Sequence, residues 1–163
     1  MKILRMMLAV CVGLAAQPSL ADESKTTVPM WEKGRATYCV RGAIHGMGEV
    51  DLMVDTGSGY LVINEQALGV LAANEQVRYL RDLRGVLADG TTLVVPVYSV
   101  NAVNIGGGCW LHDIEAAVFP GRTRFILGLS ALTKASPFVF SVAPPQLKLS
   151  NCRGAPTLAG NVP

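Results

Sequence analysis

The sequence predicts a mainly β domain, with its strands in a barrel or a sandwich and with one or two short helices. Half of the 163 residues are apolar and 16% are charged, a composition typical of a compact core and not of a disordered segment. Short apolar runs recur along the chain, and several alternate with polar residues as strands do. The 17 glycines and 9 prolines separate these runs and predict tight turns.

The first half of the domain is expected to form a hairpin, a third strand and a helix. Val50, Leu52 and Val54 occupy every second position, which predicts one face of a strand. Asn64 carries a side chain that caps helices, and apolar residues at helical spacing follow it. A second helix over residues 75–83 has a weaker pattern. The predicted elements are strands at 38–44, 50–54 and 60–63, a Gly turn at 45–48 and a helix at 64–72.

The second half contains further turns that predict hairpins. Asp89-Gly90 is a favoured two-residue hairpin turn, and it lies between runs at 86–88 and 91–95. Pro96 has no N–H to donate to a neighbouring strand, so it predicts a bend or a sheet edge. The remaining predicted elements are strands at 98–105, 114–119, 137–142 and 146–150, a Gly turn at 106–108, a short apolar run at 125–128 and helical turns at 129–133.

Residues 1–21 have the pattern of a secretory signal peptide. Two basic residues begin it, residues 6–16 are apolar, and a small-x-small cleavage site ends at Ala21. The apolar run is too short for a transmembrane anchor, which needs about 20 residues, and Cys11 lies in a poor context for a lipoprotein signal. We expect an exported protein, periplasmic in a Gram-negative cell and otherwise secreted, with no membrane anchor after removal of the leader.

The chain after the leader is expected to be one domain without a nucleic-acid partner. Two of the 14 basic residues lie in the leader, so 12 remain against 12 acidic residues, and no basic stripe is left to bind a polyanion. The cluster of Arg78, Arg81 and Arg84 is interpreted as a solvated face. The expected boundaries are a flexible N-terminal arm at 22–35, the domain at 36–152 and a loose tail at 153–163.

Three cysteines remain after the leader, at positions 39, 109 and 152. An odd number allows at most one disulfide within the chain, and the third thiol is free or pairs between chains. His45 and His112 are the only histidines, and no CxxC or HxxxH spacing is present. We therefore expect no metal ion, no catalytic Cys–His pair and no cofactor.

The sharpest local feature is the run from Val54 to Gly59, with the sequence VDTGSG. Its aspartate, Asp55, follows a predicted strand and opens a Gly-rich loop. The carboxylate is therefore presented above the sheet, where loop amides can donate hydrogen bonds to it. A plain surface turn uses the same residue types, because Asp and Gly are common in turns.

This run resembles the active-site loop of the aspartic peptidases, in which two apolar residues precede Asp-Thr-Gly-Ser/Ala. The resemblance continues at Ile126, Leu127 and Gly128, which match the apolar-apolar-Gly motif that opens a short helix in that family. The hairpin at 86–95 stands where the family has its flap. The chain is most similar to the bacterial retropepsin-like peptidases, which carry one Asp-Thr-Gly per chain, and the similarity covers most of the sequence after the leader.

The resemblance implies a single-lobed, retropepsin-like closed β-barrel and cleavage of a peptide or protein substrate. The chemistry needs two carboxylates that share a proton, one acting as base toward a water and the other as acid toward the scissile carbonyl. This chain has one copy of the motif. The second Asp55 must then come from another copy across a two-fold axis, so we expect a homodimer.

Roles for the loop residues also follow from the resemblance. Asp55, Thr56 and Gly57 are assigned to catalysis, with Thr56 bonding across the dimer axis. Ser58 would donate to the carboxylate, which favours the charged form and predicts an acidic pH optimum. The substrate would lie extended beneath the flap and add β-type hydrogen bonds. The residues expected to bind it are Ser58, Gly59, Ala88, Asp89 and Gly90.

The resemblance further places the Gly turn near the C-terminal strand, which implies a disulfide between Cys109 and Cys152. Two other functions fit the sequence with fewer specific signals. The same fold can bind peptides or assemble with a partner without cleaving, and an all-β structural protein can carry Asp-Thr-Gly by chance. A monomer in solution would favour these alternatives, and sensitivity to transition-state analogues would favour the peptidase.

Overall fold

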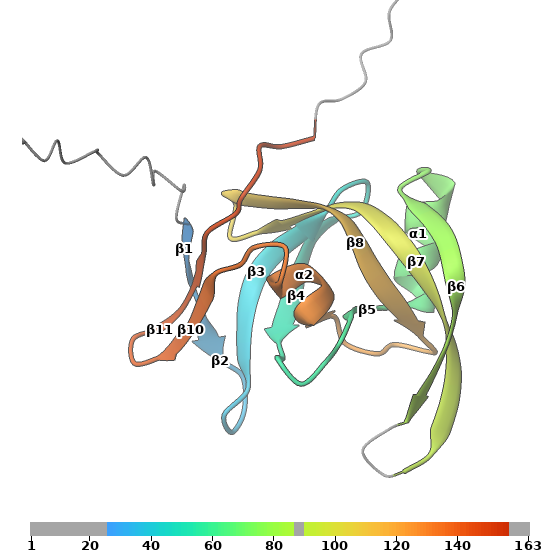
Figure 1. The fold of residues 1–163 in the computed structure, drawn as a ribbon, viewed down its shortest axis with the longest axis horizontal. Coiled ribbons are helices and arrows are strands. Elements are labelled where there is room, and N and C mark those ends of the chain that lie inside the picture. Colours follow the sequence, from blue (N-terminus) through green and yellow to red (C-terminus); the bar gives the residue numbers. More distant parts are fainter. Residues whose placement is uncertain (1–25, 87–89, 157–163) are drawn as a thin grey trace, which may run out of the picture.

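The computed structural model of the protein describes residues 26–86 and 90–156. These residues form a mainly β fold with two short helices (Figure 1), which confirms the predicted fold class. The elements, in chain order, are β1 (Thr26–Pro29), β2 (Trp31–Glu32), β3 (Tyr38–Ile44), β4 (Gly48–Val54), β5 (Leu61–Asn64), α1 (Glu65–Ala73), β6 (Val77–Val86), β7 (Thr92–Ile105), β8 (Cys109–Phe119), β9 (Ile126–Leu127), α2 (Leu129–Leu132), β10 (Phe138–Val142) and β11 (Pro145–Leu149).

The larger of two sheets closes on itself into a ring. Its strand order is β2-β3-β4-β9-β5-β8-β7-β6, and β3 pairs a second time, with β7. This second pairing joins Gly42 to Ile105 and Ile44 to Val103. A Cβ on Gly42 would lie 2.7 Å from the Asn104 carbonyl oxygen, so a residue without a side chain lets β3 approach β7 closely enough to close the ring.

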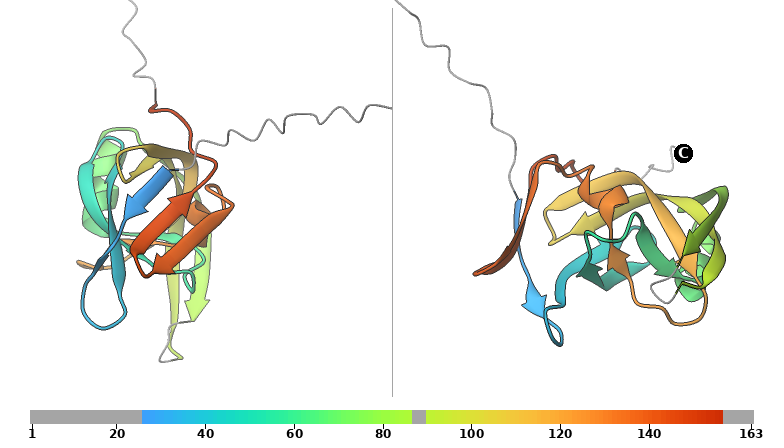
Figure 2. Two further views of the ribbon diagram at one scale, coloured as in Figure 1. Left: turned by 90° about the vertical axis from the view of Figure 1, so that its left-hand side faces the viewer. Right: turned by 60° about the horizontal axis from the view of Figure 1, so that its bottom comes forward.

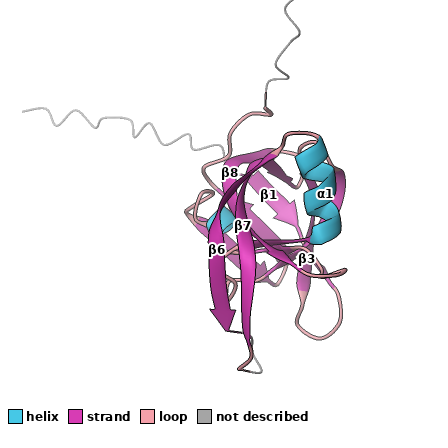
Figure 3. Ribbon diagram, turned by 90° about the vertical axis from the view of Figure 1, so that its right-hand side faces the viewer, coloured by secondary structure: helices cyan, strands magenta, loops and turns pink. Residues whose placement is uncertain are grey.

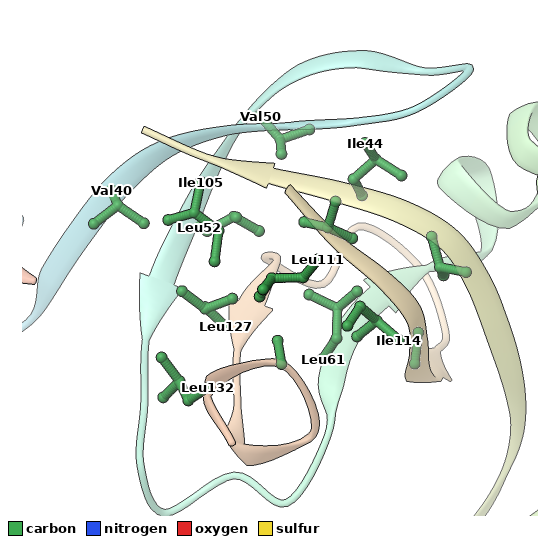
Figure 4. Close-up of a cluster of buried hydrophobic side chains, with 14 of the residues drawn as sticks. Val40, Ile44, Val50, Leu52, Leu61, Ile105, Leu111, Ile114, Leu127 and Leu132 are labelled. Carbon is green, nitrogen blue, oxygen red and sulfur yellow. The ribbon is translucent and has the colours of Figure 1, made fainter. Parts of the chain in front are cut away.

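The interior of the ring is the main apolar core (Figure 4). Alternate residues of the strands point into it, because successive side chains of a strand face opposite sides of the sheet. Leu52, Leu111 and Leu127 come from three different strands, and each is at most 2% exposed. Burial of one leucine side chain contributes roughly 1.5–3 kcal/mol, so this shared core binds the strands of the ring to one another.

The two ends of the described chain meet in a second sheet of order β1-β11-β10 (Figure 2). β1 pairs with β11 along its whole length, and Val28 is buried in the main core. Part of the segment 22–35, expected to be a flexible arm, is therefore strand, since β1 and β2 lie within it. β1 could not be predicted from the sequence, because it has one buried residue and its partner strand lies at the other end of the chain.

The C-terminal boundary also shifts slightly. The tail expected from residue 153 begins with an antiparallel bridge between Arg153 and Trp110. The predicted signal peptide at 1–21 and residues 157–163 lie outside the described part of the chain. None of the described helices is long and apolar enough to cross a membrane.

The two helical predictions in the middle of the chain had different outcomes. α1 forms as predicted, and the Asn64 side chain accepts a hydrogen bond from the Ala67 N–H at 2.9 Å. Residues 77–83, within the weaker helical pattern, instead belong to β6 and pair with β7. A register shift between Tyr79 and Arg81 interrupts the alternation that would have identified the strand in the sequence.

Candidate active site

Asp55 lies directly after β4, where β4 and β9 run side by side. The two strands are parallel and pair Met53 with Ile126 and Val54 with Leu127. The Asp55 N–H donates to the Leu127 carbonyl oxygen at 3.2 Å. The structure therefore brings together the Asp-Thr-Gly loop and the apolar-apolar-Gly motif, which are far apart in the sequence.

The Asp55 carboxylate is oriented by its own loop. The Gly57 N–H donates to Asp55 Oδ1 at 2.8 Å, and the Ser58 N–H donates to the Asp55 carbonyl oxygen at 3.2 Å. A Cβ on residue 57 would lie 3.2 Å from the same Oδ1, so glycine keeps this approach open. Asp55 is half-buried, while Thr56 and Gly57 are exposed, and the tip of the loop is therefore accessible.

The start of α2 holds the loop from the other side. The Leu129 N–H donates to the Ser58 carbonyl oxygen at 2.8 Å. Gly128 makes this contact possible, because a Cβ there would lie 2.1 Å from the Tyr60 carbonyl oxygen. Close approach of two backbone segments is thus the physical reason for a glycine at this position of the motif.

Ser130 joins three further segments at the same place. Its N–H donates to the Gly59 carbonyl oxygen at 3.0 Å. Its hydroxyl accepts from the Leu61 N–H at 2.8 Å and donates to the Glu115 carbonyl oxygen at 2.7 Å. Ser130 could not be recognised from the sequence, because a serine two residues after a glycine carries no local signal of partners so distant in the chain.

One of the two loop hydroxyls has a partner other than the one implied by the resemblance. Ser58 Oγ donates to the Tyr60 carbonyl oxygen at 3.0 Å, so within one chain its partner is the backbone and not the Asp55 carboxylate. Thr56, expected to bond across a dimer axis, is exposed at the tip of the loop. Gly59 is exposed too, and its carbonyl joins the loop to α2.

The β6–β7 hairpin extends beyond the rest of the ring (Figure 3), where the resemblance expects a flap. The pairing of β7 with β8 ends at Val97, which is opposite Ala117. From Pro96 toward the tip of the hairpin, β7 pairs with β6 alone. Gly90 has a φ of +83°, a backbone conformation that favours glycine. The predicted tip residues that lie outside the described part of the chain are Ala88 and Asp89.

A second, smaller apolar cluster lies at the base of this hairpin. Its buried members are Val95, Val97 and Ala117, and Tyr60 packs against it. Tyr60 directly follows the Gly-rich loop, so it links the Asp55 loop with the hairpin. Arg81 of β6 lies over the Tyr60 ring, with its guanidinium carbon 6.0 Å from the ring centroid.

Arg81 forms a charged network at this point. Its guanidinium contacts both Glu115 carboxylate oxygens, at 2.6 and 3.3 Å, and donates to the Tyr60 hydroxyl at 3.2 Å. The hydrogen bond from Arg81 lowers the pKa of the Glu115 carboxyl, and the same bond raises the pKa of the guanidinium. Arg78, Arg81 and Arg84 are all exposed, as the interpretation of a solvated face expects, but Arg81 also has partners in Glu115 and Tyr60.

The cysteines are arranged as the resemblance implied. Cys109 and Cys152 form a disulfide, which ties the start of β8 to the segment after β11. Cys39 is a free thiol that is 4% exposed, and burial raises its pKa. Within residues 26–86 and 90–156, no group of three or more His, Cys, Asp and Glu side chains is placed to hold a metal ion.

A solved structure has a similar fold, and a protein-family model matches the sequence. The crystal structure of a retropepsin-like aspartic protease from Rickettsia conorii matches with a TM-score of 0.54 and 18% sequence identity, over 77% of this chain and 89% of that chain. The model of the family described as gag-polyprotein putative aspartyl protease matches residues 40–134. That match covers more than half of the sequence, so the chain belongs to this aspartyl protease family, as predicted. No curated protein matches the sequence.

Proposed function

We propose that this chain is an aspartic endopeptidase that acts as a homodimer around two copies of Asp55. The observation that carries the proposal is the Asp55 loop itself. A half-buried carboxylate follows β4, is oriented by the Gly57 amide, and sits in a loop whose backbone is fixed by β9 and α2. In a chain of the aspartyl protease family, this arrangement is the one that can hold a reacting carboxylate in place.

Peptide hydrolysis at this loop would need two carboxylates that share one proton. The ionised Asp55 of one copy takes a proton from the water, whose oxygen attacks the scissile carbonyl carbon. The protonated Asp55 of the other copy gives its proton to the carbonyl oxygen. Collapse of the tetrahedral intermediate then breaks the C–N bond. The leaving amine takes up the proton that the first Asp55 removed from the water, and a hydroxyl of the intermediate returns its proton to the second Asp55 as the carboxyl product forms. Each chain carries one such loop, so the second carboxylate comes from a second copy.

The edges of the two sheets support a dimer. Four strands end the sheets, namely β1 and β10 in the small sheet and β2 and β6 in the ring sheet. β2 has two residues, β1 ends at Pro29, and β6 carries charges such as Arg78 and Arg84. Short length, proline and charge all protect an edge strand from pairing with another chain. β10 has five residues, FVFSV, and none of these protective features.

β10 also exposes apolar side chains. Val139, Phe140 and Val142 are 53%, 37% and 55% exposed. Two copies of β10 can pair antiparallel across a two-fold axis, which would extend both small sheets and bring the exposed side chains of each copy beside those of the other. A second copy of the chain is the partner that this edge fits, because the proposed catalytic site is incomplete with one Asp55.

The experiment that tests the activity compares residues 22–163 of the wild type with Asp55→Asn. Both proteins are incubated with a diverse peptide pool from about pH 3 to 8, the range in which carboxylates titrate, and products are identified by mass spectrometry. We expect the wild type to cut and the variant to be about 10⁴-fold slower, because removal of a catalytic group costs rates of this order. If neither protein cuts while both are folded dimers, the fold serves as a peptide-binding module instead.

The dimer edge has a matched pair of variants. Val139 on β10 and Thr27 on β1 flank the same residue, Lys148, from opposite edges of the small sheet. We expect Val139→Glu to raise the dissociation constant of the dimer by about tenfold or more, because it places a charge in the proposed interface. Thr27→Glu places the same charge beside the same lysine and should leave dimerisation unchanged. Sedimentation velocity measures both, and equal dimer content in the two variants would rule out the β10 interface.

We also propose that the chain acts outside the cytoplasm. The Cys109–Cys152 disulfide supports this location, because disulfides persist in oxidising compartments and are rare in the cytosol. Cell fractionation with an antibody against the chain tests it, and accumulation of the full-length form in the cytoplasm would contradict it.

A further inference from the structure

The face of β6 on which Arg81 lies is determined by a β-bulge. The register between β6 and β7 shifts at Leu80, so that Arg81 is opposite Val97. Directly opposed residues of an antiparallel pair have side chains on the same face, so Arg81 shares the face of the small apolar cluster. Without the extra residue, Arg81 would be opposite Pro96, on the other face of the sheet.

On this face, Arg81 reaches two other parts of the proposed active site. It bonds to Glu115 in β8 and to the hydroxyl of Tyr60, which follows the Asp55 loop. The Glu115 carbonyl oxygen in turn accepts the Ser130 hydroxyl from α2. One continuous set of bonds therefore runs from the base of the β6–β7 hairpin, past the loop, to the helix that holds the loop.

The network fixes geometry more than it adds stability. The Arg81 and Glu115 side chains are 46% and 41% exposed, and exposed ion pairs contribute little to folding. A planar guanidinium that contacts two carboxylate oxygens and a hydroxyl nevertheless has one preferred orientation. The ion pair of Arg41 with Asp51 is similarly exposed, and Arg41 also lies over an aromatic ring, that of Trp31. That second pair joins β3 to β4 and has no bond to the Asp55 loop.

We propose that Arg81 is a positioning residue for peptide cleavage. Through Glu115 and Tyr60 it fixes the base of the β6–β7 hairpin against the Asp55 loop, and so sets how a peptide bound beneath the hairpin meets the carboxylates. The inference rests on the proposed function. It predicts that loss of Arg81 weakens productive substrate binding much more than it slows the chemical step.

Steady-state kinetics test this with residues 22–163 and a terminally blocked peptide that the wild type cuts and that has no ionisable side chain. We expect Arg81→Met to raise KM on the order of tenfold and to leave kcat within about twofold, because the hairpin that binds the peptide loses its link to the loop while the backbone bonds of the Asp55 loop stay in place. Arg41→Met removes the matched exposed ion pair and should leave both constants unchanged. The double variant Arg81→Glu with Glu115→Arg exchanges the two charges, and its KM should lie closer to the wild-type value than that of Arg81→Met.

Thermal unfolding and sedimentation of the same variants separate positioning from stability and assembly. Arg81→Met and Arg41→Met should lower Tm by similar small amounts and remain dimers. If Arg81→Met does not fold, Tyr60→Phe removes one hydrogen bond of the network and should raise KM about threefold, as a bond of this kind contributes. If the wild type is active and Arg81→Met and Tyr60→Phe have the same KM as the wild type, the inference is wrong and the proposed function stands. A wild type that cuts no peptide overturns the proposed function and the inference with it.

Discussion

The Asp55 loop and the base of the β6–β7 hairpin are neighbours, but bonds of different kinds hold them. The loop is fixed by backbone hydrogen bonds to β9 and α2 and by the close approach at Gly128. The hairpin base pairs with β8 through backbone bonds, but its link to the loop is made by partly exposed side chains, chiefly Arg81, Glu115 and Tyr60. Backbone bonds do not depend on ionisation, whereas an exposed ion pair weakens with salt and with protonation. The support of the candidate catalytic carboxylate is thus independent of salt and pH, whereas the link between the hairpin base and the loop is sensitive to both.

The largest loss of stability is expected from a substitution where the Asp55 loop meets α2. Gly128→Ala would place a Cβ 2.1 Å from the Tyr60 carbonyl oxygen and 2.7 Å from the Ser58 carbonyl oxygen. Both atoms belong to the backbone of the loop, so the clash can be relieved only by moving it. We expect the free energy of unfolding to fall by about 3 kcal/mol or more, measured by urea denaturation, with loss of cleavage.

Gly69 in α1 gives the control for this substitution. A Cβ on Gly69 meets no heavy atom within 4 Å, and alanine is favoured over glycine inside a helix by about 0.5–1 kcal/mol. Gly69→Ala should therefore stabilise the protein slightly. If Gly128→Ala were equally harmless, the backbone of the loop would not approach α2 as closely as described.

Loss of the Ser130 hydroxyl should have an intermediate effect. Ser130→Ala leaves the Leu61 N–H and the Glu115 carbonyl oxygen without the partner they share. Unsatisfied groups in partly buried positions cost about 1–3 kcal/mol, so equilibrium denaturation should show a loss in this range.

Thr133 provides the matched hydroxyl for Ser130. Its Oγ1 donates to the Leu129 carbonyl oxygen, but this bond is exposed, so Thr133→Ala should change stability by no more than about 0.5 kcal/mol. Equal effects of the two substitutions would mean that the Ser130 hydroxyl does not help to hold the loop.

The smallest effect on stability is expected at the hairpin base and depends on pH. The hydrogen bond from Arg81 lowers the pKa of Glu115, so the ionised carboxylate favours the folded state at pH values above the pKa of the unfolded chain. This contribution is lost as pH falls through the lower pKa of the folded state. Glu115→Gln should therefore reduce the free energy of unfolding near neutral pH by less than about 1 kcal/mol. The difference should disappear toward strongly acidic pH, in urea denaturation series, and should shrink in 1 M salt.

The parts of the site that could be predicted from the sequence are those with local signatures. Asp55 and Gly57 stand together at the end of an alternating strand. Gly128 is marked in the sequence by the apolar pair before it, Ile126 and Leu127. The N-cap of α1 was predictable for the same reason, since Asn64 and its partner Ala67 lie in one turn.

The rest depends on contacts between distant segments. β1 could not be recognised because Val28 is its one buried residue and its partner is the last strand. The role of Arg81 depends on a one-residue register shift in β6, and the same arginine without that shift would face the other side. Ser130 likewise acquires its partners only when β5, β8 and α2 have come together.

The cysteines have a consequence for the protein at low concentration. Cys109 and Cys152 are bonded to each other, and Cys39 is buried, so within the described ranges no surface thiol is left to link two copies covalently. A dimer formed through the described residues would then be held by non-covalent contacts, and its population would follow mass action. Because one copy supplies only one Asp55, cleavage per molecule would decline on dilution and rise wherever the chain accumulates. Abundance itself would then switch the enzyme on and off.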